Sequence, residues 1–262
     1  MRTAFLLAAM LGSGLRAAPA YSVAGIVNAA DNQAGLFAPN TLATIYGTGL
    51  AYGTKALTAD DIRGGVLPNV LPGTGVRVLV GGLLANPFYV SPTQINFLVP
   101  PSLLPGPSIL QVVLDSTSGP EIPIQILAAA PALFQLDAQN AVTTRADGSL
   151  ISPGQPAQPG DYVVMYATGL GQTVPPVAYG EVPTRAAPLK LLADFKVFLD
   201  GAALDGGGIE YAGVAPGFAG VYQINIKLPA WTGLNPELRI AIGDQLGKAG
   251  LHLPVRAPLQ PN

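Results

Sequence analysis

The apolar positions of this chain lie in short runs in which apolar and polar residues alternate. Alternation of this kind is typical of β-strands with one buried face, and helical spacing is nowhere sustained. Turn residues separate the runs, for example at Val80-Gly81-Gly82 and at Leu199-Asp200-Gly201. The pattern predicts an all-β chain, with strands at residues 76–80, 109–114, 122–126, 195–199, 238–242 and 251–255.

Two sequence signatures occur twice, in the same order. Residues 45–50 read Ile-Tyr-Gly-Thr-Gly-Leu and residues 165–170 read Met-Tyr-Ala-Thr-Gly-Leu, while residues 94–100 and 223–229 both begin with Gln-Ile-Asn and end in proline. The offset of about 120 to 130 residues is the size of a domain and not of a short repeat. We therefore predict a duplicated module. Its parts are a first domain at residues 21–135, a linker that can carry a hairpin at 136–158, and a second domain at 159–262.

The first twenty residues have the features of a secretory signal peptide. Met1-Arg2 is followed by an apolar stretch over residues 4–15 and then by Ala18-Pro19-Ala20, small residues at the positions that a signal peptidase reads. We expect cleavage before Tyr21 and export to the periplasm, the cell surface or the medium. No later apolar run approaches the length of a transmembrane helix, so we expect no transmembrane segment in the mature chain.

Composition excludes several classes of function. Only 11% of the residues are charged, the net charge is −2, and the 13 basic residues are scattered, so we expect no nucleic-acid partner. The chain has no cysteine, which excludes disulfides, thiolate metal sites and a thiol nucleophile. The fold must therefore be stabilised by its hydrophobic cores, and two domains of about 120 residues are large enough for that.

Several segments resemble a known kind of module. The strand ending in Gly-Thr-Gly-Leu at residues 47–50 and the Pro-Gly turn at 105–106 resemble the IPT/TIG immunoglobulin-like module. More specifically, the chain is similar over residues 24–256 to an uncharacterised C-terminal domain family of secreted Acidobacteria (Solibacter) proteins. The resemblance implies two tandem immunoglobulin-like β-sandwich domains after a cleaved signal peptide, and it implies no reaction. The segments that carry this second similarity are residues 25–30, 89–96, 147–150, 168–171 and 217–225.

The repeated Gln-Ile-Asn segments place two amides on one face of a strand, because residues two apart point the same way. Such a pair could bind sugar hydroxyls. The interpretation that we favour is structural, with the amides bonded to backbone groups of a neighbouring loop such as the Gly-Thr-Gly-Leu segment. The repeated structural motif comprises Tyr46, Gly49, Gln94 and Asn96 in the first half and Tyr166, Gly169, Gln223 and Asn225 in the second.

Four aromatic residues of the second half are candidates for ligand binding. Trp231, Tyr211, Phe218 and Tyr222 could form a platform on which a sugar ring stacks. The alternative, which we favour, is that these rings pack in the core or between the domains, since aromatic side chains dominate buried contacts.

The sequence offers little for catalysis or metal binding. His252 is the only histidine, Gly-x-Ser-x-Gly does not occur, and the best carboxylate pair is Asp194 with Glu210. Some acidic residues lie near turns and could ligate calcium, but their spacing matches no calcium loop. We therefore predict no catalytic residue, no metal site and no cofactor. The acidic residues near turns are Asp60, Asp61, Asp115, Asp200 and Asp205.

These observations predict a secreted, non-catalytic binding or structural module whose partner is an unknown protein or polysaccharide. One alternative is a carbohydrate-binding module for polysaccharide, which predicts an exposed aromatic row in at least one domain. A second is a glycoside-hydrolase-like enzyme with convergent carboxylates in an inter-domain cleft. A third is an interaction domain that extends the sheet of a partner through edge strands, marked here by prolines within 122–126 and 251–255.

Overall fold

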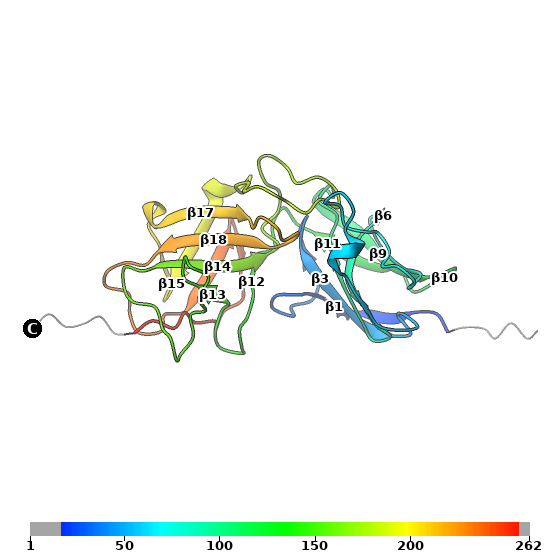
Figure 1. The fold of residues 1–262 in the computed structure, drawn as a ribbon, viewed down its shortest axis with the longest axis horizontal. Coiled ribbons are helices and arrows are strands. Elements are labelled where there is room, and N and C mark those ends of the chain that lie inside the picture. Colours follow the sequence, from blue (N-terminus) through cyan, green and yellow to red (C-terminus); the bar gives the residue numbers. More distant parts are fainter. Residues whose placement is uncertain (1–16, 257–262) are drawn as a thin grey trace, which may run out of the picture.

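The computed structural model describes residues 17–256 and consists almost entirely of β-strands. The strands form two sandwiches that lie next to each other along the longest axis, as Figure 1 shows. The predicted signal peptide, residues 1–20, falls mostly outside the described residues, and Ala20 is the first residue of strand β1. Cleavage before Tyr21 therefore stays a prediction.

Two sheets face each other in the first sandwich. One contains, in spatial order, β1 (Ala20–Asn28), β3 (Leu42–Thr48), β8 (Gln94–Leu98), β7 (Asn86–Val90) and β4 (Lys55–Ala56). The other contains β2 (Leu36–Phe37), β11 (Ile122–Ile126), β9 (Gly106–Leu114), β5 (Val76–Val80) and β6 (Leu83–Leu84), with β10 (Thr117–Ser118) paired to β9.

The second sandwich repeats this arrangement. Its first sheet contains β12 (Ala132–Leu133), β14 (Tyr162–Thr168), β18 (Tyr222–Lys227) and β17 (Ile209–Val214), with β13 (Thr143–Thr144) paired to β14. Its second sheet contains β16 (Ala202–Ala203), β15 (Phe195–Leu199), β19 (Leu238–Ile242) and β20 (Gln245–Leu246). Between residues 17 and 256, three short 3-10 helices lie in the loops of the two sandwiches: η1 (Ala59–Asp61), η2 (Leu192–Asp194) and η3 (Gly206–Gly208).

The duplication predicted from the sequence is visible in the strand order. Strands β3, β5, β8 and β9 of the first sandwich correspond in order and pairing to β14, β15, β18 and β19 of the second. The leucines of the two Thr-Gly-Leu signatures, Leu50 and Leu170, are both fully buried, one in each core. The predicted all-β fold of two sandwiches with immunoglobulin-like strand order is confirmed.

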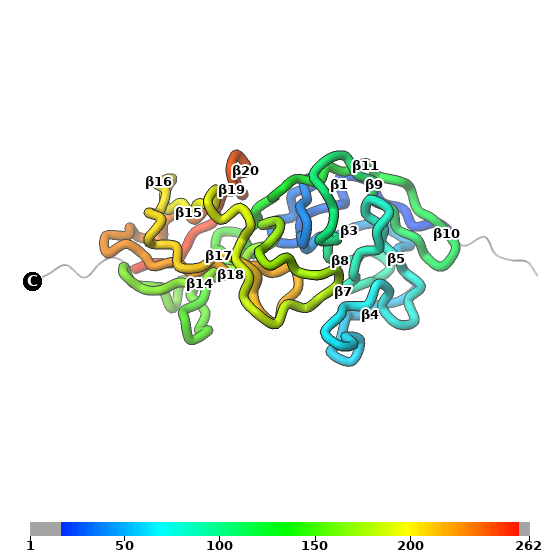
Figure 2. The backbone as a smooth tube through the Cα atoms, turned by 90° about the horizontal axis from the view of Figure 1, so that it is seen from above, coloured from blue at the N-terminus to red at the C-terminus, as the bar shows by residue number. Residues whose placement is uncertain are grey.

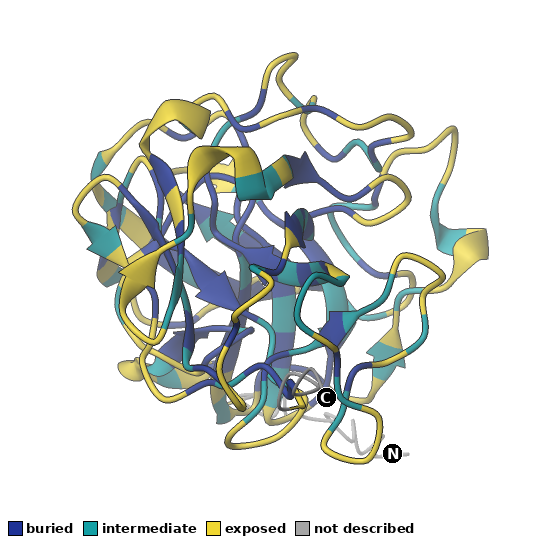
Figure 3. Cartoon of the chain, turned by 90° about the vertical axis from the view of Figure 1, so that its left-hand side faces the viewer, coloured by how far each residue is buried: buried dark blue, intermediate teal, exposed yellow. Residues whose placement is uncertain are grey.

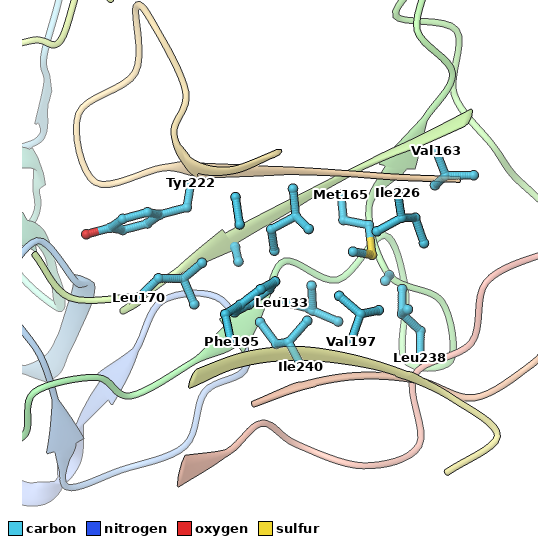
Figure 4. Packing of buried hydrophobic residues seen from close by; sticks show 14 of the residues in the cluster. Leu133, Val163, Met165, Leu170, Phe195, Val197, Tyr222, Ile226, Leu238 and Ile240 are labelled. Carbon is cyan, nitrogen blue, oxygen red and sulfur yellow. The ribbon is translucent and has the colours of Figure 1, made fainter. Parts of the chain in front are cut away.

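Each sandwich has its own hydrophobic core between its two sheets. Alternate residues of the strands supply it, as the period-two pattern requires, for example Val76, Val78 and Val80 in β5. Figure 4 shows the second core, in which Met165 and Ile226 from one sheet pack toward Val197 and Ile240 from the other.

The strand pairing differs from the predicted division of the chain. Ala132 and Leu133 already pair with Thr168 and Ala167, and the N–H of Ala130 donates to the carbonyl of Gly169 at 2.7 Å. The first sandwich ends with β11 at Ile126. Within residues 136–158, β13 pairs with β14 of the second sandwich, and apolar residues such as Ile151 belong to the second core.

Strand β11 is not an edge strand, although its proline led us to expect one. Pro123 lies opposite Ile109 of β9, on the side where β11 has a partner over its whole length. On its other side β2 pairs in parallel only with Gln125 and Ile126, so it does not require an N–H from residue 123. Pro123 therefore limits how far β2 can pair along β11, but it does not prevent this pairing.

The loops that follow the two Thr-Gly-Leu signatures meet at the junction between the sandwiches, near the middle of Figure 2. The N–H of Leu67 donates to the carbonyl of Gly180 at 2.7 Å, and the N–H of Val182 donates to Gly65 at 2.8 Å. A separate apolar cluster covers this contact and includes buried residues of both sandwiches, Leu67, Leu98 and Ala219. Backbone pairing and buried apolar area thus join the two sandwiches directly.

Candidate functional site

The repeated amides form the same contact in both sandwiches. The side-chain N–H of Gln94 donates to Oδ1 of Asn96, and that of Gln223 donates to Oδ1 of Asn225, both at 2.8 Å. These side chains are half-buried on the face of the sheet that points away from the core, since Ile95 and Ile224 between them are fully buried. We call the pairs the amide pairs.

Two tyrosines flank each amide pair in the same register. Tyr46 lies opposite Gln94 and Tyr89 opposite Asn96, and in the second sandwich Tyr166 lies opposite Gln223 and Tyr211 opposite Asn225. The four-residue arrangement is therefore duplicated as a whole. The repeated sequence motif contained three of the four members in each half. The fourth member, Tyr89 in the first half and Tyr211 in the second, was placed beside the amide pair by the strand register.

The amide pairs do not bond to the loop that we expected them to hold. Backbone groups hold that loop instead: the N–H of Gly47 donates to Thr93 at 3.1 Å and that of Leu50 to Pro92 at 3.0 Å. Gly49 and Gly169 have φ values of +63° and +75°, the left-handed conformation that glycine adopts without strain. The motif glycines therefore shape the loop, and the amides satisfy each other on the sheet face.

The structure does not bring the four candidate aromatic residues together. Tyr222 is fully buried, and its hydroxyl donates to the carbonyl of Gly171 inside the second sandwich. Burial raises the pKa of this tyrosine. Figure 4 shows its ring at one end of the second core, next to Leu170. Tyr211 is half-buried, and its hydroxyl donates to the carbonyl of Val214 at 2.8 Å.

Phe218 and Trp231 are exposed, but they lie at opposite ends of β18. Phe218 precedes the strand on the side of the first sandwich, and Trp231 follows it at the free end of the molecule. A strand of six residues separates its ends by about 20 Å, which is too far for the two rings to contact one sugar unit. A single platform of all four rings is therefore excluded by their positions.

Trp231 lies at the tip of a tight turn in the loop between β18 and β19. The N–H of Thr232 donates to the carbonyl of Pro229 at 3.1 Å, and its hydroxyl donates to the same oxygen at 2.7 Å. This turn directs the indole away from the core and leaves 80% of the residue exposed. Figure 3 views this end of the second sandwich, where exposed loops surround buried strands.

A hollow of about 180 Å³ lies beside Trp231, between its loop and the β15–β16 hairpin; we call it the Trp231 hollow. Its surface is mainly apolar, with polar groups from Asp200 and Thr232. One oxygen of Asp200 accepts from the N–H of Glu237 at 2.8 Å, and within residues 17–256 its other oxygen forms no hydrogen bond. The apolar lining residues are Leu199, Ala202, Ala203, Leu204, Pro229 and Pro236.

A second, smaller hollow lies at the junction of the sandwiches, around Asp31. This residue is only 6% exposed, and Oδ1 of its carboxylate accepts from the N–H of Gln33 at 2.9 Å. Lys248 of the second sandwich reaches across and donates to the backbone carbonyl of Asp31 at 3.4 Å. Burial raises the pKa of the Asp31 carboxyl, and the Gln33 N–H and the Lys248 charge oppose this rise.

The carboxylates considered for hydrolysis do not converge. Asp194 precedes β15, and its carbonyl accepts from Gly243, at the end of the second sheet where β19 finishes. Glu210 lies in the other sheet near the start of β17, which pairs with the end of β18. Because β15 runs from one end of the sandwich to the other, about 15 Å separates the two ends. The pair cannot flank one glycosidic bond.

Two further features of residues 17–256 bear on function. In this part of the chain no group of three or more histidine, cysteine, aspartate or glutamate side chains is arranged to hold a metal ion. The same residues contain no helix with the length and apolar character needed to cross a membrane.

No protein-family model matches the chain, and no curated protein matches it either. The resemblance to the Acidobacteria family therefore stays a prediction.

Solved structures similar to the chain include two glycan-binding proteins. One is the SGBP-B protein of the Bacteroides ovatus mixed-linkage glucan utilization locus, with 10% identity over 84% of this chain and 42% of that protein, and a TM-score of 0.33. Another is the surface glycan-binding protein PbSGBP-B from Prevotella bryantii, with 10% identity, coverages of 89% and 41%, and a TM-score of 0.27. The chain thus spans less than half of these proteins.

The fibronectin(III)-like modules of Clostridium thermocellum CbhA are also similar, with 11% identity, coverages of 84% and 90%, and a TM-score of 0.20.

Proposed function

We propose that this protein is an exported, non-catalytic binding module that binds a polysaccharide at the Trp231 hollow. The exposure of Trp231 beside an apolar hollow is the observation that carries the proposal. An exposed indole on a hydrogen-bonded turn offers a flat face on which the apolar face of a sugar ring can stack.

The polar groups of the hollow support a sugar over a purely apolar ligand. The unbonded oxygen of Asp200 can accept from a hydroxyl, and the Thr232 hydroxyl, which donates to Pro229, keeps a lone pair to accept another. A volume of about 180 Å³ is below the roughly 300 Å³ of the smallest pockets for drug-sized ligands, so the hollow suits one ring of a longer chain.

Trp231 is the only tryptophan of the chain, and its fluorescence therefore reports on this site alone. The test is a fluorescence titration of residues 21–262 with a panel of soluble polysaccharides, together with pull-down on insoluble ones. We expect a saturable change in emission with at least one polysaccharide, because stacking removes water from the indole.

The variant Trp231→Ala should abolish pull-down, and Phe218→Ala is its matched control. Phe218 is another exposed aromatic residue, 62% accessible, at the opposite end of β18. Binding that is lost in the first variant and kept in the second supports the proposal. Binding that survives Trp231→Ala, or an absence of binding to every polysaccharide, contradicts it.

A further inference from the structure

The loop that carries Trp231 also borders another hollow, on the side away from the Trp231 hollow and distinct from the hollow around Asp31. This hollow, of about 330 Å³, is lined by Gln139, Asn140, Asn235, His252 and two prolines; we call it the His252 hollow. Its surface is polar and apolar in about equal parts, whereas the Trp231 hollow is mainly apolar.

The two hollows are close because one stretch of backbone separates them. Pro236 lines the first and Asn235 lines the second, and the Cα atoms of consecutive residues are about 3.8 Å apart. The strands behind the hollows are also neighbours, since Leu199 pairs with Leu238 and Glu237 bridges to His252. With strands about 4.8 Å apart, the hollows lie on the order of 10 Å from each other.

Hydrogen bonds in the His252 hollow fix which groups it offers. Nδ1 of His252 lies 3.0 Å from the backbone carbonyl of Asn235, and a carbonyl oxygen only accepts, so Nδ1 carries the proton. In the neutral ring Nε2 is then a hydrogen-bond acceptor. Oδ1 of Asn235 accepts from the N–H of Val255 at 3.1 Å. The group of this side chain that remains to bond a ligand is therefore its amide nitrogen, which carries two N–H donors.

An acceptor and amide donors in the lining of one hollow suit hydroxyl groups, because each hydroxyl both donates and accepts. An apolar hollow with an exposed indole, followed after about 10 Å by a hollow of this polarity, suits a chain of linked rings better than a single small molecule. We infer that the two hollows are parts of one extended site, in which a polysaccharide stacks on Trp231 and continues across Asn235 into the His252 hollow. This inference rests on the proposed function.

The test measures how affinity depends on chain length. Cello-, malto- and manno-oligosaccharide ladders are titrated against Trp231 fluorescence in the wild-type protein and in the variants His252→Ala and Gln139→Ala. Gln139 is exposed and makes its contact to His252 through its backbone carbonyl, so its truncation should not disturb the fold. Gln155→Ala, which removes an exposed glutamine outside both hollows, is the matched control.

We expect the wild-type affinity to rise along a ladder, and each hollow variant to lose about five- to tenfold on the longer members while binding the shortest members normally. Equal affinity of wild type and both variants for long members overturns the extended site and leaves the Trp231 site standing. An equal loss on short and long members also overturns it. A Trp231 emission that responds to no oligosaccharide or polysaccharide overturns the proposed function and the extended site together.

Discussion

The hydroxyl of Thr168 accepts a hydrogen bond from the backbone N–H of Leu42 at 2.8 Å, and so links the last residue of β14 in the second sandwich to the first residue of β3 in the first sandwich. The same hydroxyl donates to the carbonyl of Gly220 at 2.7 Å, and Thr168 is fully buried. The corresponding residue of the other signature, Thr48, is exposed. The duplicated threonines therefore differ in role.

Thr168→Val should lower the free energy of unfolding by about 1–3 kcal/mol, because an isosteric side chain leaves a buried N–H and a buried carbonyl without their partner. Thr48→Val is the matched control and should change stability by less than about 0.5 kcal/mol. Urea denaturation of the two variants checks this. Equal effects of the two substitutions would show that the junction does not depend on the hydroxyl.

The motif glycines offer a second pair of matched substitutions. Gly49→Ala places a side chain at positive φ and should cost about 1–2 kcal/mol. Gly169→Ala has the same backbone cost, and its Cβ would also overlap the carbonyl oxygen of Ala130, whereas Cβ at residue 49 meets only Ala18 at 3.7 Å. Thermal denaturation should therefore give a clearly lower melting temperature for Gly169→Ala. A lower value for Gly49→Ala would contradict the close contact between Gly169 and Ala130.

The amide pairs should differ in stability because their neighbours differ. In the first sandwich the buried hydroxyl of Thr44 also donates to Oδ1 of Asn96, at 3.1 Å, while Val164 occupies the equivalent position beside Asn225. Asn96→Ala should therefore destabilise the protein by about 1 kcal/mol more than Asn225→Ala, since it also removes the acceptor of Thr44. Chemical denaturation measures the difference, which should disappear when both are made in a Thr44→Val background.

Asp31 should make stability depend on pH in a direction unusual for a carboxyl group. Burial raises its pKa in the folded state, so between its ordinary pKa and the raised value the folded protein binds more protons than the unfolded chain. Its contribution to the free energy of unfolding therefore falls as pH rises through that window. Asp31→Asn keeps the oxygen that accepts from Gln33. Compared with the wild-type protein at the same pH, the variant should have a higher relative stability at neutral pH than at acidic pH.

Asp137→Asn is the control for this measurement, because hydrogen bonds from Asn140 and Gln139 lower the pKa of the exposed Asp137 carboxyl. Its contribution has the opposite sign: it is present above the ordinary pKa and is lost as pH falls through the lowered value. Urea denaturation at acidic and neutral pH compares the two variants. A pH dependence of the same sign in both would refute the burial argument for Asp31.

The sequence predicted the fold better than the site, for physical reasons that particular residues illustrate. Alternating valines in β5 and the repeated Thr-Gly-Leu signatures report on burial and backbone conformation, which act locally. The position of β12 could not be read in this way, because Ala132-Leu133 is too short to have a period and joins its sheet only through β14.

The aromatic candidates show the same limit. Tyr222 and Trp231 belong to the same residue class and lie nine positions apart, yet one is fully buried and the other is 80% exposed. Alternation along β18 places Tyr222 inward, but the exposure of Trp231 depends on a turn after the strand has ended. Its hollow depends further on the β15–β16 hairpin, which is distant in the sequence.

The meeting of the two long loops makes the order of the modules matter. Leu67 and Gly65 of the first loop pair with Gly180 and Val182 of the second, and Gly220 packs against the first sandwich, where a Cβ would overlap Leu98 and Leu42. These partners are not repeated in the other module. A chain carrying the same two modules in reversed order would keep both cores and lose the junction. Its two sandwiches would then move independently of each other.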